Sequence, residues 1–122
     1  MGSTIAVVDD DPSVLRGIGR LLEAHGYETR VFDSAEKFLS EDTAREARCL
    51  VLDIHLGGMS GIDLRRQLSA LGANIPVIFV SATDDPAARA DALDAGCIAF
   101  LQKPFTARSL VDAIQKARTR PN

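Results

Sequence analysis

The chain has 122 residues, of which 46% are hydrophobic and 25% charged, and its formal net charge is −3. This length and composition suit one domain with a single core and argue against intrinsic disorder. So mild a charge argues against nucleic acid or an anionic membrane as the main partner, and no stretch is long enough to span a bilayer. A strand pattern begins almost at the N-terminus, so we expect no signal peptide and a cytoplasmic protein.

The predicted elements alternate between strands and helices. In chain order we expect a strand at 5–8, a helix from Pro12 to Gly26, an edge strand at 28–32, a short helix capped by Asp33 or Ser34 and running through Leu39, a polar connection at 40–47, a strand at 48–53, a helix from Ser60 to Gly72, a strand at 77–80, a helix at 88–95, a strand at 98–101 and a final helix capped by Thr106. Capping residues, twice followed by proline, mark the helix starts, and glycines mark helix ends.

Four of the five strands are continuous apolar runs, which is typical of strands buried on both faces of a parallel sheet. The pattern predicts an α/β fold of the flavodoxin-like (βα)5 type, a doubly wound parallel five-stranded sheet in the order 2-1-3-4-5. We interpret residues 1–122 as one domain. Cys49 and Cys97 lie in apolar runs, and we interpret them as small buried hydrophobic residues in a reducing compartment, with a disulfide as the alternative.

Polar side chains follow four of these strands. Asp9 and Asp10 end the first strand, and Asp53 ends the third. Ser81 ends the fourth strand and Lys103 follows the fifth. The carboxyl ends of parallel strands meet at one edge of the sheet, where ligands bind in such folds. Three carboxylates repel one another unless a cation intervenes, and hard oxygen ligands suit Mg²⁺. With a hydroxyl and an ammonium to bind an anion, the set favours phosphoryl transfer to Asp53.

Four motifs resemble the receiver domain of two-component response regulators, and the resemblance extends in order over essentially the whole chain. They are Val-Val-Asp-Asp-Asp at 7–11, Leu-Asp-Ile-His-Leu-Gly-Gly-Met-Ser-Gly at 52–61, Val-Ser-Ala at 80–82 and Lys-Pro-Phe at 103–105. Residues 26–39 and 59–61 are most similar to receivers of the FixJ/NarL-type subfamily, whose full-length members carry a helix-turn-helix DNA-binding output domain. No output domain is present in this chain.

The resemblance implies a metal site and an acceptor. Asp53 would accept the phosphoryl group and also bind Mg²⁺. Asp10 would be a direct ligand, Asp9 would act through water, and the backbone carbonyl of His55 would complete the protein ligands. The side chain of His55 is expected to be exposed in a loop.

The resemblance also implies a switch. Ser81 matches the hydroxyl that binds the phosphoryl group, Phe100 the aromatic switch position, and Lys103 the residue that pairs with phosphate. A cis bond is implied between Lys103 and Pro104. From the residues alone, Ser81 could be a turn residue, Lys103 a solvated lysine and Phe100 ordinary packing.

By resemblance, a sensor histidine kinase phosphorylates Asp53 and thereby reshapes the surface of the fourth helix and fifth strand. The candidate residues of that surface are Arg89, Ala92, Leu93 and Phe100. The surface would support a homodimer or hold a DNA-binding output domain. Such a module contacts no membrane and is not an enzyme, since it catalyses only its own phosphorylation and dephosphorylation.

Three departures and two alternatives remain. Gly57 stands where the family usually has proline, which loosens the loop after Asp53. His55 and Thr83 occupy positions that tune acyl-phosphate hydrolysis in the family, and Phe100 lacks a tyrosine hydroxyl. A phosphatase of the haloacid-dehalogenase type would need an aspartate where His55 stands. A degenerate receiver acting as a scaffold has no support, because every key position is filled. The chain is either a stand-alone receiver or a piece of a longer regulator.

Overall fold

Five parallel strands form the centre of the structure, a computed structural model that describes residues 4–119. The strands are β1 (Thr4–Val8), β2 (Glu28–Phe32), β3 (Cys49–Asp53), β4 (Val77–Ser81) and β5 (Ala99–Gln102). Their order across the sheet is β2-β1-β3-β4-β5, which confirms the predicted topology. The chain enters the sheet at β1, crosses to the β2 edge, and then returns past β1 to build the other half.

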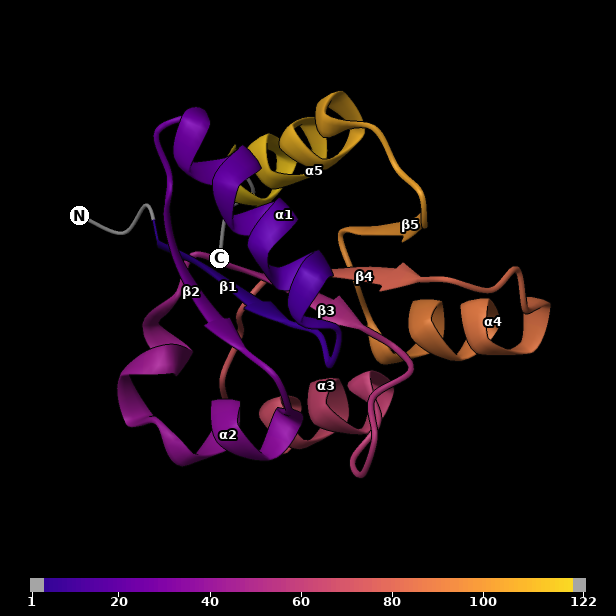
Figure 1. Cartoon of the computed structure of the whole chain (residues 1–122). Helices are drawn as coiled ribbons and strands as arrows, with labels where there is room; N and C mark the ends of the chain where they lie inside the picture. The colour runs from indigo at the N-terminus through magenta and orange to yellow at the C-terminus, as the bar shows by residue number, and fades with distance from the viewer. Residues whose placement is uncertain (1–3, 120–122) are drawn as a thin grey trace.

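Five α-helices cover the two faces of this sheet (Figure 1). They are α1 (Pro12–Ala24), α2 (Ala35–Ser40), α3 (Gly61–Ala70), α4 (Pro86–Ala95) and α5 (Ala107–Thr119), and a 3₁₀ helix, η1 (Asp42–Glu46), lies between α2 and β3. Helices α1 and α5 pack on one face, and α2, α3 and α4 pack on the other.

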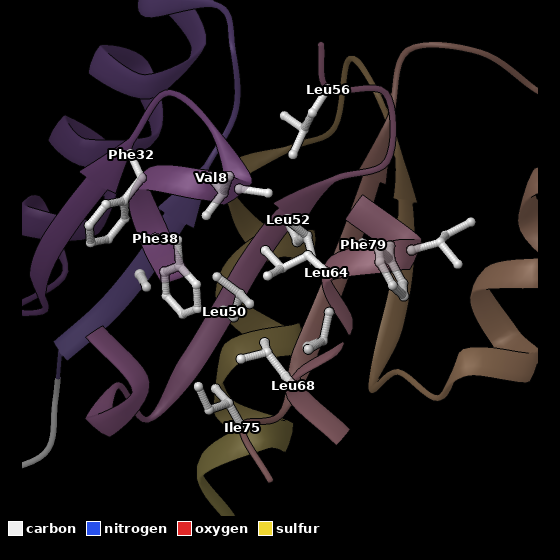
Figure 2. Close-up of a cluster of buried hydrophobic side chains, with 14 of the residues drawn as sticks. Val8, Phe32, Phe38, Leu50, Leu52, Leu56, Leu64, Leu68, Ile75 and Phe79 are labelled. Carbon is white, nitrogen blue, oxygen red and sulfur yellow. The ribbon is translucent and has the colours of Figure 1, made fainter. Parts of the chain in front are cut away.

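Each face of the sheet has its own hydrophobic core, because successive strand side chains point to opposite faces. Val51 and Ile78 pack with Leu22 of α1 and Ile114 of α5 in one core. In the other core, strand residues such as Leu50, Leu52 and Phe79 pack with Phe38 of α2 and Leu64 of α3 (Figure 2). This arrangement explains why the strands read as unbroken apolar runs.

Each of the five α-helices begins after a residue whose side chain caps it. The cap oxygens of Asp11, Ser34, Ser60, Asp85 and Thr106 accept hydrogen bonds from backbone N–H groups two or three residues later, at 2.9–3.1 Å. Of the two predicted caps for the second helix, Asp33 and Ser34, the cap is therefore Ser34. These caps satisfy N–H groups that have no partner within the helix.

A few predicted boundaries are wrong. Helix α4 begins at Pro86, directly after its cap, and the connection at 40–47 contains η1. Strand β5 is shifted by one residue from the predicted 98–101, because its ladder with β4 runs from the pair Ile78 and Ala99 to the pair Ser81 and Gln102. Both cysteines are free, so the disulfide alternative is wrong; Cys49 is buried, but Cys97 is only half-buried. Within residues 4–119, no helix is both long and apolar enough to cross a membrane.

Candidate functional site

The predicted site residues meet at the carboxyl edge of the sheet. Asp9 directly follows β1, and Asp53 and Ser81 are the last residues of β3 and β4. The register pairs Asp53 with Val80, so Ser81 lies one position beyond Asp53 on the neighbouring strand. The backbone N–H of Lys103 donates to the carbonyl of Ser81 at 2.7 Å, which brings the residue after β5 to the same edge.

Three carboxylates gather at this edge. One oxygen each from Asp9, Asp10 and Asp53 lies within 4.8 Å of the others, an arrangement that could hold a metal ion. Asp9 is 1% exposed and Asp53 is 5% exposed, while Asp10 is open to solvent. Burial, and then the negative charge of Asp9, raise the pKa of Asp53 above its usual value, although a hydrogen bond from the His55 N–H and the charge of Lys103 partly offset them. A cation here would relieve this repulsion.

Lys103 reaches into the acidic cluster. Its Nζ lies 2.7 Å from Oδ2 of Asp9 and 3.5 Å from Oδ2 of Asp53. Burial alone lowers the pKa of Lys103, but the hydrogen bond to Asp9 and the charges of Asp53 and Asp9 outweigh burial and raise it. The side chain is only 18% exposed, so the alternative of a solvated lysine is wrong. The peptide bond between Lys103 and Pro104 is cis.

Asp9 has hydrogen bonds on both of its carboxylate oxygens. Oδ1 accepts from the backbone N–H of Asp11 at 2.9 Å, and Oδ2 accepts from Lys103. A carboxylate engaged in this way is less free than the exposed Asp10 to turn toward a ligand. The donor set of the cluster consists only of oxygens, which fits a hard cation.

Ser81 and Thr83 form a local network beside the acids. Ser81 is fully buried, and its Oγ donates to the carbonyl of Thr83 at 3.1 Å and accepts from the Thr83 N–H at 3.2 Å. These are the turn contacts typical of serine at a strand end. Nε2 of His55 lies 3.2 Å from Oγ1 of Thr83, so a chain of polar contacts joins the loop after β3 to the loop after β4. The His55 side chain is exposed, as predicted.

The surface of α4 and β5 differs in one residue from the prediction. Phe100 is half-buried on β5, and the guanidinium carbon of Arg89 lies 5.1 Å from the centre of its ring. Leu93 is 59% exposed. Ala92, predicted to lie on this surface, is fully buried instead, because it packs into the core beneath α4.

Two residues near the site escaped the sequence analysis as functional candidates. A Cβ added to Gly61 would lie 2.2 Å from the backbone oxygen of Asp53, so this position requires glycine for a close approach of backbones. The sequence signal for Gly61 was a glycine at the start of a helix, where glycine is a poor helix former.

The second residue is Glu36 of α2, which accepts a hydrogen bond from the N–H of Met59, in the loop after β3, at 3.0 Å. No sequence pattern links Glu36 to Met59.

Comparisons with known proteins agree with this geometry. Residues 5–115 match the family model of the response regulator receiver domain. The response regulator protein TmoT of Ectopseudomonas mendocina is 39% identical over 115 residues, which are 94% of this chain and 52% of TmoT. The transcriptional regulatory protein TdiR of Thauera aromatica is also 39% identical over 115 residues, covering 94% of this chain and 51% of TdiR. The chain thus spans about half the length of these curated relatives.

A solved structure agrees with both the fold and the family. The crystal structure of FixJ-N superimposes with a TM-score of 0.88 at 32% sequence identity, covering 98% of this chain and 95% of that chain. The match extends through β1 to β5 and therefore includes every strand that contributes to the acidic edge. The chain belongs to the receiver domain family of response regulators.

Proposed function

We propose that this receiver accepts a phosphoryl group on Asp53 from the phosphohistidine of a sensor histidine kinase. The observation that carries the proposal is the position of the buried Asp53 between two further acids and the ammonium of Lys103. In the transfer, a carboxylate oxygen of Asp53 attacks phosphorus and forms an O–P bond while the N–P bond to the imidazole breaks. The electron pair of that bond stays on the imidazole nitrogen, and the product on this chain is an aspartyl phosphate.

Asp10, Asp53 and the backbone carbonyl of His55 would hold Mg²⁺, with Asp9 contributing through water. The all-oxygen donor set and the raised pKa of Asp53, caused first by burial and then by Asp9, support a divalent cation at this position. When bound, Mg²⁺ supplies positive charge that offsets repulsion between the carboxylates and the incoming phosphoryl oxygens.

Lys103 and Ser81 would recognise the phosphorylated state. The ammonium of Lys103 already lies 3.5 Å from Asp53, close enough to pair with phosphoryl oxygens carried there. Ser81 now bonds to Thr83, so contact with the phosphoryl group requires it to exchange partners. That exchange would pull on the loop that leads into α4. The phosphoryl group thereby biases an equilibrium between two arrangements of this region.

The output of the switch would be the surface of α4 and β5, which presents Arg89, Leu93 and Phe100. We propose that this surface supports a phosphorylation-dependent homodimer or holds a DNA-binding output domain that lies outside this chain. TdiR is named as a transcriptional regulatory protein, which supports a role in transcription regulation. It is about twice as long as the matched region, which supports an output domain outside this chain. The setting would be the cytoplasm, where the kinase presents its phosphohistidine.

The decisive test is the intact mass of the protein after incubation with phosphoramidate, with and without Mg²⁺. The wild type should gain the mass of one phosphoryl group only when Mg²⁺ is present, and Asp53→Asn should gain none. Asp33→Asn is a matched control, because Asp33 lies at the end of the edge strand and pairs with Lys37 instead. If the wild type binds Mg²⁺ but gains no mass, the acceptor role fails and the scaffold alternative takes its place.

A further inference from the structure

The loop between β3 and α3 is restrained at both of its ends. His55 contacts Asp53 and Thr83 near its start, and Leu56 is buried in the core, whereas Glu36 contacts its later residues. The loop carries the backbone carbonyl of His55, a metal ligand in the proposed function, on which the following inference therefore rests. Gly57 and Gly58 are adjacent in this loop, and Gly58 has a φ of +83°. Glycine has more backbone freedom than any other residue, so ordering such a loop costs more conformational entropy. The position of the His55 carbonyl therefore depends partly on contacts that restrain the glycine-containing part of the loop.

Glu36 of α2 contacts this loop at two successive residues. Its Oε2 accepts a hydrogen bond from the backbone N–H of Met59 at 3.0 Å. A Cβ added to Gly58 would lie 3.0 Å from the same oxygen, so the carboxylate also lies close to the backbone of Gly58. A carboxylate that accepts an N–H bond makes a charge-assisted contact, which is stronger than a neutral one.

Helix α2 provides a fixed base for Glu36. The neighbours Ala35 and Phe38 are fully buried, and the rings of Phe38 and Phe32 pack edge to face with centroids 5.3 Å apart. The Oγ of Ser34 accepts the N–H of Lys37, which fixes the first turn. Glu36 itself is exposed, so its side chain does not serve the core. The buried residues hold its backbone, and the carboxylate reaches the loop.

We infer that Glu36 is a positioning residue, which restrains Gly58 and Met59 and through them the His55 carbonyl that would bind the metal. Its effect falls on metal affinity, because the carbonyl is a ligand and takes no part in bond making. Groups that orient a metal ligand commonly change metal affinity by roughly 10–100-fold. Glu36 is exposed and acts through the loop backbone, so we expect a smaller effect, about fivefold. In this chain, helix α2 thus takes over restraint that a proline at Gly57 would supply.

Two substitutions separate the hydrogen bond from the charge. Glu36→Ala removes both, whereas Glu36→Gln removes the charge and keeps an oxygen that accepts the Met59 N–H. Glu28→Gln is the matched control for net charge, since Glu28 is exposed at the start of β2, the opposite end of the sheet. Amide hydrogen exchange of Met59 reports the hydrogen bond directly. A Mg²⁺ titration followed by amide chemical shifts reports affinity and needs no phosphorylation.

Glu36→Ala should speed the exchange of the Met59 amide and weaken Mg²⁺ binding about fivefold. Glu36→Gln should fall between Glu36→Ala and the wild type, because its neutral oxygen accepts a weaker hydrogen bond, and Glu28→Gln should match the wild type. Unchanged Mg²⁺ affinity in Glu36→Ala would overturn the inference. A loss in Glu36→Gln as large as in Glu36→Ala would also overturn it, because charge and not the hydrogen bond would then be the cause. If the wild type binds Mg²⁺ but accepts no phosphoryl group, the proposed phosphoryl transfer is refuted. The Mg²⁺ titration then still tests the role of Glu36. A wild type that binds no Mg²⁺ refutes the metal site and the role of Glu36 together.

Discussion

Replacing Gly61 by alanine tests the close approach of α3 to the end of β3. The new Cβ would lie 2.2 Å from the backbone oxygen of Asp53 and 3.0 Å from the Cα of Ile54. Carbon and oxygen atoms in close contact settle at roughly 3.3 Å, so the backbones have to separate by about 1 Å. Both neighbours are backbone atoms, which cannot rotate away as the end of a long side chain can.

The expected loss follows from two opposing effects. Overpacking a tight site costs about 1–3 kcal/mol, and the upper part of that range applies where backbone has to move. Alanine recovers up to about 1 kcal/mol over glycine as a helix former. We therefore expect Gly61→Ala to lower the free energy of unfolding by about 2 kcal/mol, or the melting temperature by about 8 °C. The displaced strand end carries Asp53, so phosphorylation by phosphoramidate should slow as well.

Urea unfolding followed by circular dichroism measures this loss as a lower midpoint at an unchanged m-value. Gly57→Ala is the control, because nothing lies within 4 Å of its new Cβ and its φ is not positive. That variant should equal the wild type or exceed it by up to about 1 kcal/mol, since alanine restricts the unfolded chain. Equal stability of Gly61→Ala and Gly57→Ala would refute the reasoning.

Three further predictions concern ionisation and metal. Asp53→Asn should unfold at higher urea than the wild type at pH 7 without Mg²⁺. Burial, and then the charge of Asp9, raise the pKa of Asp53 on folding, so the folded wild type keeps the full stability of a protonated carboxyl below the unfolded pKa and loses it as the pH rises through the folded pKa. The stability advantage of Asp53→Asn should therefore shrink toward pH 4. A difference in stability that does not depend on pH would contradict this. Adding Mg²⁺ should raise the urea midpoint of the wild type but not that of Asp53→Asn, because only a folded site with all its ligands binds the ion. Burial raises the pKa of Cys49 to about 12, so iodoacetamide at pH 8 should label only the half-buried Cys97 in the folded protein and both thiols in urea, as intact mass would show.

The fold and the acidic edge could be predicted because their signals are local. Each buried strand is a continuous apolar run, and the residue that ends it lies at the rim whatever the details of packing. Asp9, Asp53 and Ser81 were placed in this way. Lys103 needed the fold as well, since a lysine after a strand is usually solvated.

The remaining features depend on contacts between elements that a sequence does not link. The hydrogen bond between Glu36 and Met59 spans 23 positions and two loops. The burial of Ala92 was missed because α4, rich in alanine, has no distinct apolar side from which its inward face could be read. The role of Gly61 depends on a distance between backbones, which only the folded chain defines.

Helix α4 buries little apolar surface against the sheet, and in the proposed function this sets how readily phosphorylation moves the helix. Ala92 is its one fully buried side chain, and Ala95 packs partly buried against the same core, whereas α1 buries three large aliphatic residues. One buried methyl group contributes roughly 1 kcal/mol, about as much as one hydrogen bond gained or lost at the phosphoryl group. Under the proposed function, a change of that size would suffice to move α4 but not a helix that buries three large aliphatic residues. A larger aliphatic residue that packs at position 92 without a clash would make the protein more stable, and phosphorylation would then move α4 less.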